Sequence, residues 1–114
     1  MVVQRGEVWW ADLEDPRGSS SGYRRPVVVV QADAFNRSRL QTVVVVVLTS
    51  NLELLDAPGN VLIPRQYSAL PKDSVANVSQ VLTLDRDYLT ELAARLPSRS
   101  MAAVDAGLRT VLDL

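Results

Sequence analysis

Two uninterrupted valine runs, at residues 27–30 and 43–47, constrain the fold of this 114-residue chain more than any other feature. They belong to a set of 18 valines. Branching at Cβ restricts a side chain in a helix, whereas it fits the pleated surface of a strand. A run that is apolar on both faces is typical of a strand at the centre of a sheet or at an interface. We therefore expect a core that is mainly β-sheet.

Shorter patterns predict the remaining strands. Residues 6–13 mostly alternate, which places Val8, Trp10 and Leu13 on one side. The second strand begins at Pro26, because a missing N–H suits a first strand position. Turn residues separate a short strand at 61–63 from a longer one at 75–84. This spacing predicts one domain over residues 1–114, built as a mostly antiparallel barrel.

Helical patterns are confined to three segments. Residues 33–42 are polar and suit a turn or a short helical piece. The tail from Ser98 has apolar residues at helical spacing, with Ser98 or Ser100 available as N-cap, so a C-terminal helix should pack on the barrel. Residues 85–96 also keep a helical period, but some barrels need a short strand there. Both interpretations of that segment stay open.

The chain contains no cysteine and no histidine. Disulfides, thiolate nucleophiles, imidazole bases and the usual zinc sites are therefore excluded. Carboxylates at Asp12, Glu14 and Asp15 could hold a hard cation, but such a cluster at a strand exit is more typical of a solvated turn. No glycine-rich phosphate-binding motif follows a strand. We expect neither a metal nor a cofactor.

The longest apolar run, residues 43–48, is far shorter than the roughly 20 residues of a membrane span. The N-terminal residues do not resemble a secretion signal. We therefore expect a soluble, cytoplasmic protein with no membrane partner.

Charge is distributed unevenly along the chain. The formal net charge is −1, yet residues 17–42 contain five arginines and one acid, Asp33, for a local net charge of +4. Such a segment is a candidate phosphate-facing patch. The adjacent Trp9 and Trp10 should point to opposite faces of their strand, one into the core and the other toward a groove or a subunit contact.

RNA supplies its own nucleophile, the 2′-hydroxyl, so an RNA-cleaving enzyme can work with arginine and hydroxyl groups. Arg25 stands at a loop-to-strand junction, where its guanidinium can reach a phosphate; the alternative is a plain surface charge. Thr49 and Ser50 end a buried strand and could donate to phosphate oxygens. In that position they also commonly satisfy backbone groups of a turn.

Several ordered motifs together resemble the MazF/PemK family of toxin endoribonucleases over essentially the whole chain. The matching segments are Arg5-Gly-Glu-Val-Trp-Trp-Ala-Asp-Leu13, Gly18-Ser19, Arg25-Pro-Val-Val-Val29, Leu48-Thr49-Ser50-Asn51, Lys72-Asp-Ser-Val75, Ser79-Gln80 and Thr83-Leu-Asp85. The resemblance implies an SH3-like barrel of the CcdB/Kid/MazF type with a C-terminal helix, and a homodimer. It also implies a MazE-like cognate antitoxin as partner.

The implied activity is sequence-specific, metal-independent cleavage of single-stranded RNA, in particular messenger RNA. The products are 2′,3′-cyclic phosphate and 5′-hydroxyl ends. Carried over by position, Arg25 and Thr49 are the principal active-site pair. The residues expected to bind RNA are Ser19, Ser20, Gly22, Tyr23, Arg24, Asn36, Arg37, Ser50, Asn51 and Gln80.

Two segments depart from the family pattern. Some members have Arg-x-Asp where this chain has Asn77-Val78-Ser79, so their acid–base scheme does not transfer. The first loop reads Gly18-Ser-Ser-Ser-Gly-Tyr23 where the family often has Gly-Ser-Glu-Gln-Gly-Gly. Two other functions stay open: a non-enzymatic gyrase poison like CcdB, whose Trp-Gly-Ile tail this chain lacks, and a barrel that only binds an antitoxin.

Overall fold

Six strands form one antiparallel sheet in the computed structural model, counted over residues 2–13 and 24–114, the part of the chain that the structure describes. The strand order is β4-β5-β3-β2-β1-β6. The strands are β1 (Glu7–Asp12), β2 (Arg24–Val29), β3 (Thr42–Thr49), β4 (Val61–Ile63), β5 (Ser74–Asp85) and β6 (Leu89–Arg95). The helical segments are α1 (Asp33–Asn36), η1 (Leu52–Asp56), α2 (Arg65–Ser68), η2 (Arg86–Tyr88) and α3 (Ser98–Leu112).

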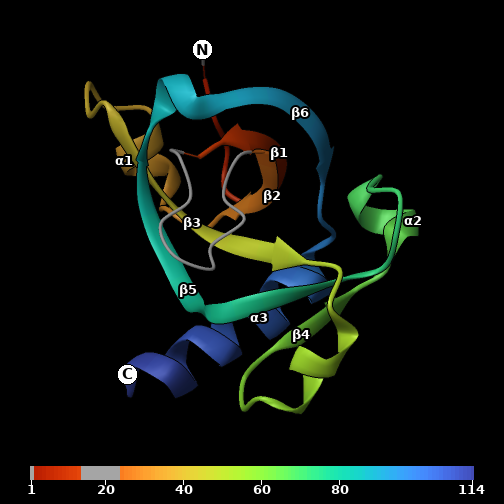
Figure 1. Ribbon diagram of the computed structural model, residues 1–114. Coiled ribbons are helices and arrows are strands. Elements are labelled where there is room, and N and C mark those ends of the chain that lie inside the picture. The colour runs from red at the N-terminus through yellow and green to blue at the C-terminus, as the bar shows by residue number, and fades with distance from the viewer. Residues whose placement is uncertain (1, 14–23) are drawn as a thin grey trace.

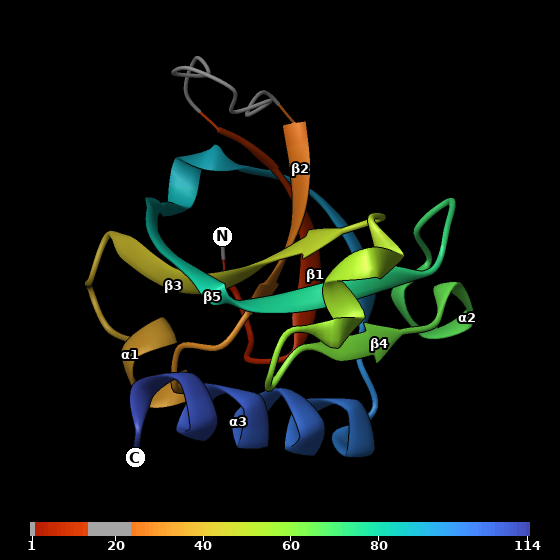
Figure 2. The same ribbon diagram turned by 60° about the horizontal axis from the view of Figure 1, so that its bottom comes forward.

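The sheet curls into a half-barrel whose edges are β4 and β6 (Figure 1). Figure 2 shows α3 lying along one side of this half-barrel, beneath the strands. The expected class, an antiparallel barrel with a C-terminal helix, is confirmed, although the sheet is open between its two edge strands. The valine runs fill β2 and β3, which are both central, as their two-sided apolar character predicted.

Alternation along β2 and β3 divides the valines between two cores. Val27 and Val29 pack inside the curved sheet, together with the odd-numbered valines of β3. Val28 and Val46 face the opposite side, where Met101 of α3 covers them. A strand presents successive side chains to opposite faces, so one valine run can supply both cores.

The structure corrects details of the first two strands. β2 begins at Arg24, two residues before Pro26, because Arg24 and Arg25 already pair with β1. The pairing of β2 with β3 starts only at Val27. The missing N–H of Pro26 therefore costs no bond to β3. Leu13 was expected beside Val8 and Trp10, but it packs against the inner core, on the side of Trp9 and Ala11.

Residues 85–96 form η2 followed by the edge strand β6, which settles the alternative in favour of a strand. β6 pairs with β1. The helical spacing of the leucines in residues 85–96 is coincidental, because Leu89 enters the inner core, Leu96 enters the outer core and Leu92 is exposed.

The predicted C-terminal helix is confirmed as α3, whose Met101 and Val104 are buried while Val111 and Leu112 are exposed. The expected serine cap is wrong. Pro97 occupies the N-cap position, so Ser98 and Ser100 already lie within the helix and make no capping hydrogen bond. Among the described residues, no helix is both long and apolar enough to cross a membrane.

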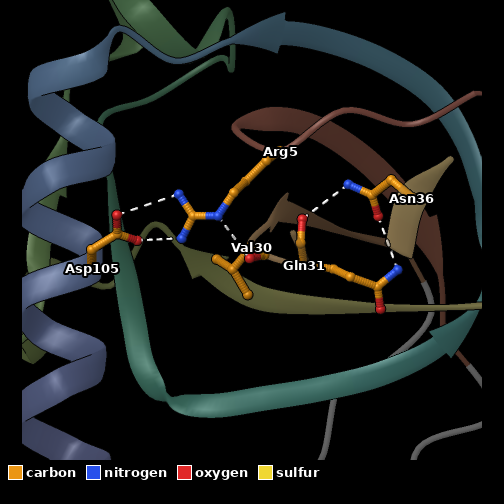
Figure 3. A network of polar contacts seen from close by, with 5 residues as sticks. All are labelled: Arg5, Val30, Gln31, Asn36 and Asp105. Atoms are coloured by element: carbon orange, nitrogen blue, oxygen red, sulfur yellow. Dashed lines mark hydrogen bonds and ion pairs between the residues drawn. The ribbon is translucent and has the colours of Figure 1, made fainter. Parts of the chain in front are cut away.

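Polar contacts connect α3 to the N-terminal segment (Figure 3). The Arg5 Nε donates to the carbonyl oxygen of Val30 at 2.9 Å, and the other guanidinium nitrogens bind the carboxylate of Asp105. One side chain thus joins the segment before β1, the end of β2 and the middle of α3. None of these three residues lines the cleft described next.

Candidate active site

The pairing of β2 with β3 brings Arg25 and Thr49 together. The ladder between β2 and β3 ends at the antiparallel pair of Val27 with Val47. Arg25 and Thr49 each lie two residues beyond this pair, at the same end of the two strands. The register therefore aims a guanidinium and a hydroxyl at the same end of the sheet.

An open cleft of about 520 Å³ lies at this end of the sheet. Its lining comes from β1, β2, the end of β3, the segment between α2 and β5, and the first residue of β5. The lining residues are Trp10, Arg24, Arg25, Pro26, Leu48, Thr49, Ser50, Leu70, Pro71, Lys72 and Ser74. The cleft thus contains both residues of the expected active-site pair.

The charge of this cleft is positive. Arg24, Arg25 and Lys72 contribute three cations, and no carboxylate is among the described residues that line it. Hydroxyl groups of Thr49 and Ser50 lie beside them. Guanidinium and hydroxyl donors together match the oxygens of a phosphodiester.

Thr49 also has a structural partner. Its hydroxyl oxygen accepts the backbone N–H of Asn51 at 3.2 Å, and the Asn51 side chain in turn accepts the N–H of Glu53 at 3.2 Å. Asn51 is therefore the N-cap of η1. Because the Thr49 oxygen acts as an acceptor in this turn, its own proton stays available for donation.

Arg24 is held in place by two neighbours. Its guanidinium lies 4.5 Å from the centroid of the Trp10 ring, and its Nη2 donates to Glu91 Oε1 at 2.6 Å. Trp9 is buried in the inner core, and its Nε1 donates to Glu7 at 3.0 Å. The expectation that one tryptophan fills the core while the other faces a groove is confirmed.

Asn36 and Arg37 do not lie in the cleft. They follow β2 at the far end of the β2–β3 pair, and the eight residues of β3 separate the two ends by about 23 Å. The Asn36 side chain is only 2% exposed. It donates to the Gln31 carbonyl and accepts the Gln31 amide, both at 2.9 Å (Figure 3). Asn36 therefore has a structural role in this segment, and the expected binding of RNA by Asn36 and Arg37 stays a prediction.

Gln80 lies outside the cleft lining, next to a bulge in β5. The register between β3 and β5 shifts between Val46 and Val47, so that residues 78–80 have no partner in β3. Asn77 donates to Gln80 at 2.9 Å and accepts the Ser79 hydroxyl at 3.1 Å. These contacts connect the side chains of Asn77, Ser79 and Gln80 with one another.

The other expected RNA-binding residues divide into two groups. Arg24 and Ser50 line the cleft, and Asn51 is the next residue in the chain after Ser50. Ser19, Ser20, Gly22 and Tyr23 lie outside the described residues. Within the described ranges, no group of three acidic side chains could hold a metal ion, and Glu14 and Asp15 fall outside those ranges.

The sequence reasoning did not single out two groups of the cleft. Lys72 and Ser74 reach it from the segment after α2, whose last turn ends at Ala69 in a left-handed conformation. Leu70 anchors that segment in the outer core. The available signal was the segment from Lys72 to Val75, which carries the only lysine of the chain.

Comparison with known proteins identifies related chains. A family model described as PemK-like, MazF-like toxin of type II toxin-antitoxin system matches residues 4–112. The chain is 49% identical to endoribonuclease MazF6 of Mycobacterium tuberculosis over 114 residues, which is 100% of both chains. It is 35% identical to endoribonuclease EndoA of Bacillus subtilis over 114 residues, or 100% of this chain and 97% of that protein.

A solved structure has the same fold over nearly the full length. It is an endoribonuclease from a mycobacterial species in complex with its cognate antitoxin. The TM-score is 0.79 at 25% sequence identity, with 98% of this chain and 96% of that chain covered. The half-barrel with its C-terminal helix is thus shared with that toxin.

Proposed function

We propose that this chain, which belongs to the PemK-like, MazF-like toxin family of type II toxin-antitoxin systems, is an endoribonuclease toxin that cleaves single-stranded RNA at short sequence motifs. The observation that carries the proposal is that Arg25 and Thr49 both line one positively charged cleft. These two side chains can donate hydrogen bonds to a phosphodiester, and the RNA itself supplies the nucleophile, its 2′-hydroxyl.

The reaction we propose is transesterification. The 2′-oxygen attacks the adjacent phosphorus and loses its proton, while the bond from phosphorus to the 5′-oxygen breaks and that oxygen gains a proton. The products are a 2′,3′-cyclic phosphate and a 5′-hydroxyl. No metal takes part in these steps.

Arg25 has the role of stabilising the negative charge that develops on the phosphorane oxygens. A guanidinium stays protonated at any physiological pH, so it acts as a donor and not as a base. The Thr49 hydroxyl donates to a phosphate oxygen and orients the scissile group. Lys72 and Arg24, at the rim of the cleft, hold the flanking phosphates.

The proposed protein partners follow from membership of this toxin family. An endoribonuclease of similar sequence and fold is known in complex with its cognate antitoxin, and we propose that this toxin is also neutralised by a MazE-like antitoxin. We further propose that the toxin is a homodimer and acts in the cytoplasm, where its messenger RNA substrate is translated.

The experiment compares the purified protein with its Arg25→Ala variant on a long RNA of little structure, in the presence of EDTA. We expect discrete cuts with 5′-hydroxyl ends, and a loss of about 10²- to 10³-fold in the variant, as for removal of one oxyanion donor. Mapping the 5′ ends also reveals the motif. The matched control is Arg109→Ala, since Arg109 is exposed on α3 away from the cleft.

Three results would contradict parts of the proposal. RNA that stays intact with the wild-type protein would favour a CcdB-like gyrase poison or a barrel that only binds an antitoxin. Cleavage that EDTA abolishes would refute the metal-independent reaction. Equal rates for wild type and Arg25→Ala would refute the role of Arg25.

A further inference from the structure

Arg24 reaches across a complete strand of the sheet. β1 lies between β2 and β6, and Trp10 of β1 pairs with Pro26 on one side and with Glu91 on the other. Arg24, two residues before Pro26, is on the same face as Trp10 because strand side chains alternate. Its side chain passes over the Trp10 ring and binds Glu91.

The Trp10 ring is covered on two sides by different kinds of group. It packs against the outer core, the cluster that also contains Leu70 of the cleft wall. The Arg24 guanidinium lies over the ring, 4.5 Å from its centroid, and both residues line the cleft. A guanidinium is planar and stacks on aromatic rings. A nucleobase is also planar and stacks on the same kind of surface.

We propose that Trp10 is the stacking platform for one nucleobase of the bound RNA, and that Arg24, latched by Glu91, covers this platform in the free protein. The inference rests on the proposed function, because it names a base-binding subsite beside Arg25 and Thr49. When RNA enters, a backbone phosphate replaces Glu91 as the partner of Arg24. The guanidinium then leaves the ring, and the base takes its place.

The exposure of the Arg24–Glu91 ion pair indicates that this contact can break when RNA binds. The Arg24 and Glu91 side chains are 47% and 64% exposed, so water and salt screen their attraction. A phosphate in the cleft offers Arg24 an equivalent or better acceptor. The ring itself stays fixed, since the outer core supports it from behind. A fixed Trp10 ring, covered only by an Arg24 side chain in a weak ion pair, suits reversible stacking of a base.

The first test uses Trp10 as its own reporter. The chain has two tryptophans, so Trp9→Phe leaves Trp10 as the only one. The ligand is a 2′-O-methyl version of a cleaved oligonucleotide, which has no free 2′-hydroxyl and stays intact. We expect Trp10 fluorescence to be quenched along the same binding curve that anisotropy of a labelled oligonucleotide gives. Normal binding with unchanged Trp10 emission would overturn the inference.

The second test removes the platform. We expect Trp10→Leu to weaken binding of the 2′-O-methyl oligonucleotide by roughly 5- to 150-fold, the range that corresponds to the loss of one base–aromatic stack. Trp10→Phe keeps an aromatic surface and should restore most of the affinity. Circular dichroism and thermal unfolding show whether each variant is folded. Equal affinities for the folded Leu and Phe variants would overturn the platform.

The third test addresses the latch. Glu91→Gln should strengthen binding by about two- to fivefold, because an exposed ion pair no longer competes for Arg24. In an Arg24→Gln background the same substitution should have no effect, since the double-mutant cycle isolates the coupling. Asp87→Asn, an exposed acid outside the cleft, is the control for general charge. A gain that persists without Arg24 would overturn the latch.

These outcomes separate the subsite from the proposed function. A wild-type protein that neither binds nor cleaves RNA would refute the function itself. A protein that cleaves RNA while its Trp10 fluorescence is unchanged by the bound oligonucleotide would refute only the stacking role of Trp10.

Discussion

Gly107 of α3 packs directly on the backbone of Gly59, in the turn that precedes β4, so that a Cβ added to Gly107 would overlap the Gly59 carbonyl oxygen. Gly59 has a φ of 85°, which other residues rarely adopt. Val78 of β5 flanks both glycines. The contact fixes α3 against the turn between η1 and β4.

We expect Gly107→Ala to destabilise the protein by about 3 kcal/mol, because the added methyl group meets backbone and cannot be relieved by a rotamer change. The sign is informative, since alanine in place of glycine usually stabilises a helix by about 1 kcal/mol. Urea unfolding measures the change. The control is Ala106→Gly, at the exposed neighbouring position, which should cost only about 1 kcal/mol. An unchanged midpoint for Gly107→Ala would contradict the close approach.

Thr49→Val should lower the rate constant for RNA cleavage by about 10- to 100-fold, because a hydroxyl donor to a charged phosphate is lost. Thr49→Ser keeps the hydroxyl and should retain most of the activity. Thr49 also accepts the Asn51 N–H, so the valine variant should lose about 1 kcal/mol of stability. Single-turnover cleavage and urea unfolding separate the two effects. Equal activity of the valine and serine variants would show that the hydroxyl has no catalytic role.

Asn36→Ala should cost about 2 kcal/mol of folding stability, because the backbone carbonyl oxygen and one side-chain N–H of Gln31 lose the partners that Asn36 supplies. Cleavage of RNA by the folded variant should be unchanged. Thermal unfolding and the cleavage assay, run on the same preparation, give both quantities. Normal stability combined with lost RNA binding would instead support the role that was first expected for Asn36.

The sheet could be predicted because its signals are local. The valine runs mark two central strands, and their alternation determines which valines face each core. Arg25 and Thr49 could be placed at strand ends for the same reason. Once the two strands are paired, the register of Val27 with Val47 is sufficient to bring both residues to the same end of the strand pair.

The remainder depends on contacts between residues that are distant in the sequence. Residues 85–96 carry a helical pattern, and only pairing with β1 makes part of them a strand. Asn36 looked like a surface residue in a polar segment, although Gln31 buries its amide. No local pattern reveals that Arg24 meets Glu91, because the pairing of β1 with β6 brings them together. Tertiary pairing thus overrides local pattern at these positions.

Asp33 makes stability depend on pH at the acid end. The backbone N–H of Arg5 donates to its carboxylate at 2.8 Å, and Asn36 donates at 3.1 Å. These hydrogen bonds, with smaller contributions from the charges of Arg37 and Arg95, hold the pKa of Asp33 below its usual value of 3.8 and outweigh the effect of burial. The folded state therefore releases the proton more readily than the unfolded state does.

The sign follows from linkage. The stabilisation by ionised Asp33 is complete above the unfolded pKa and is lost as pH falls from about 4 through the lower folded pKa. We expect Asp33→Asn to be less stable than wild type at neutral pH, with a difference that shrinks below pH ~4. Urea unfolding across the acid range measures this difference. Asp113→Asn, at the exposed end of α3, serves as the control. A difference that stays constant with pH would contradict the assignment.

The salt dependence of RNA affinity should come from the cations of the cleft and not from all arginines of residues 17–42. Each phosphate contact on a single strand contributes about −0.7 to the slope of log K against log salt concentration. Removing a contact with Arg25→Gln should therefore flatten the slope by about 0.7. Arg37→Gln and Arg39→Gln should leave it unchanged, because both residues lie beyond the far end of β3 from Thr49. Fluorescence anisotropy with the 2′-O-methyl oligonucleotide gives the slopes. Equal flattening by all three variants would mean that the RNA follows the entire basic segment.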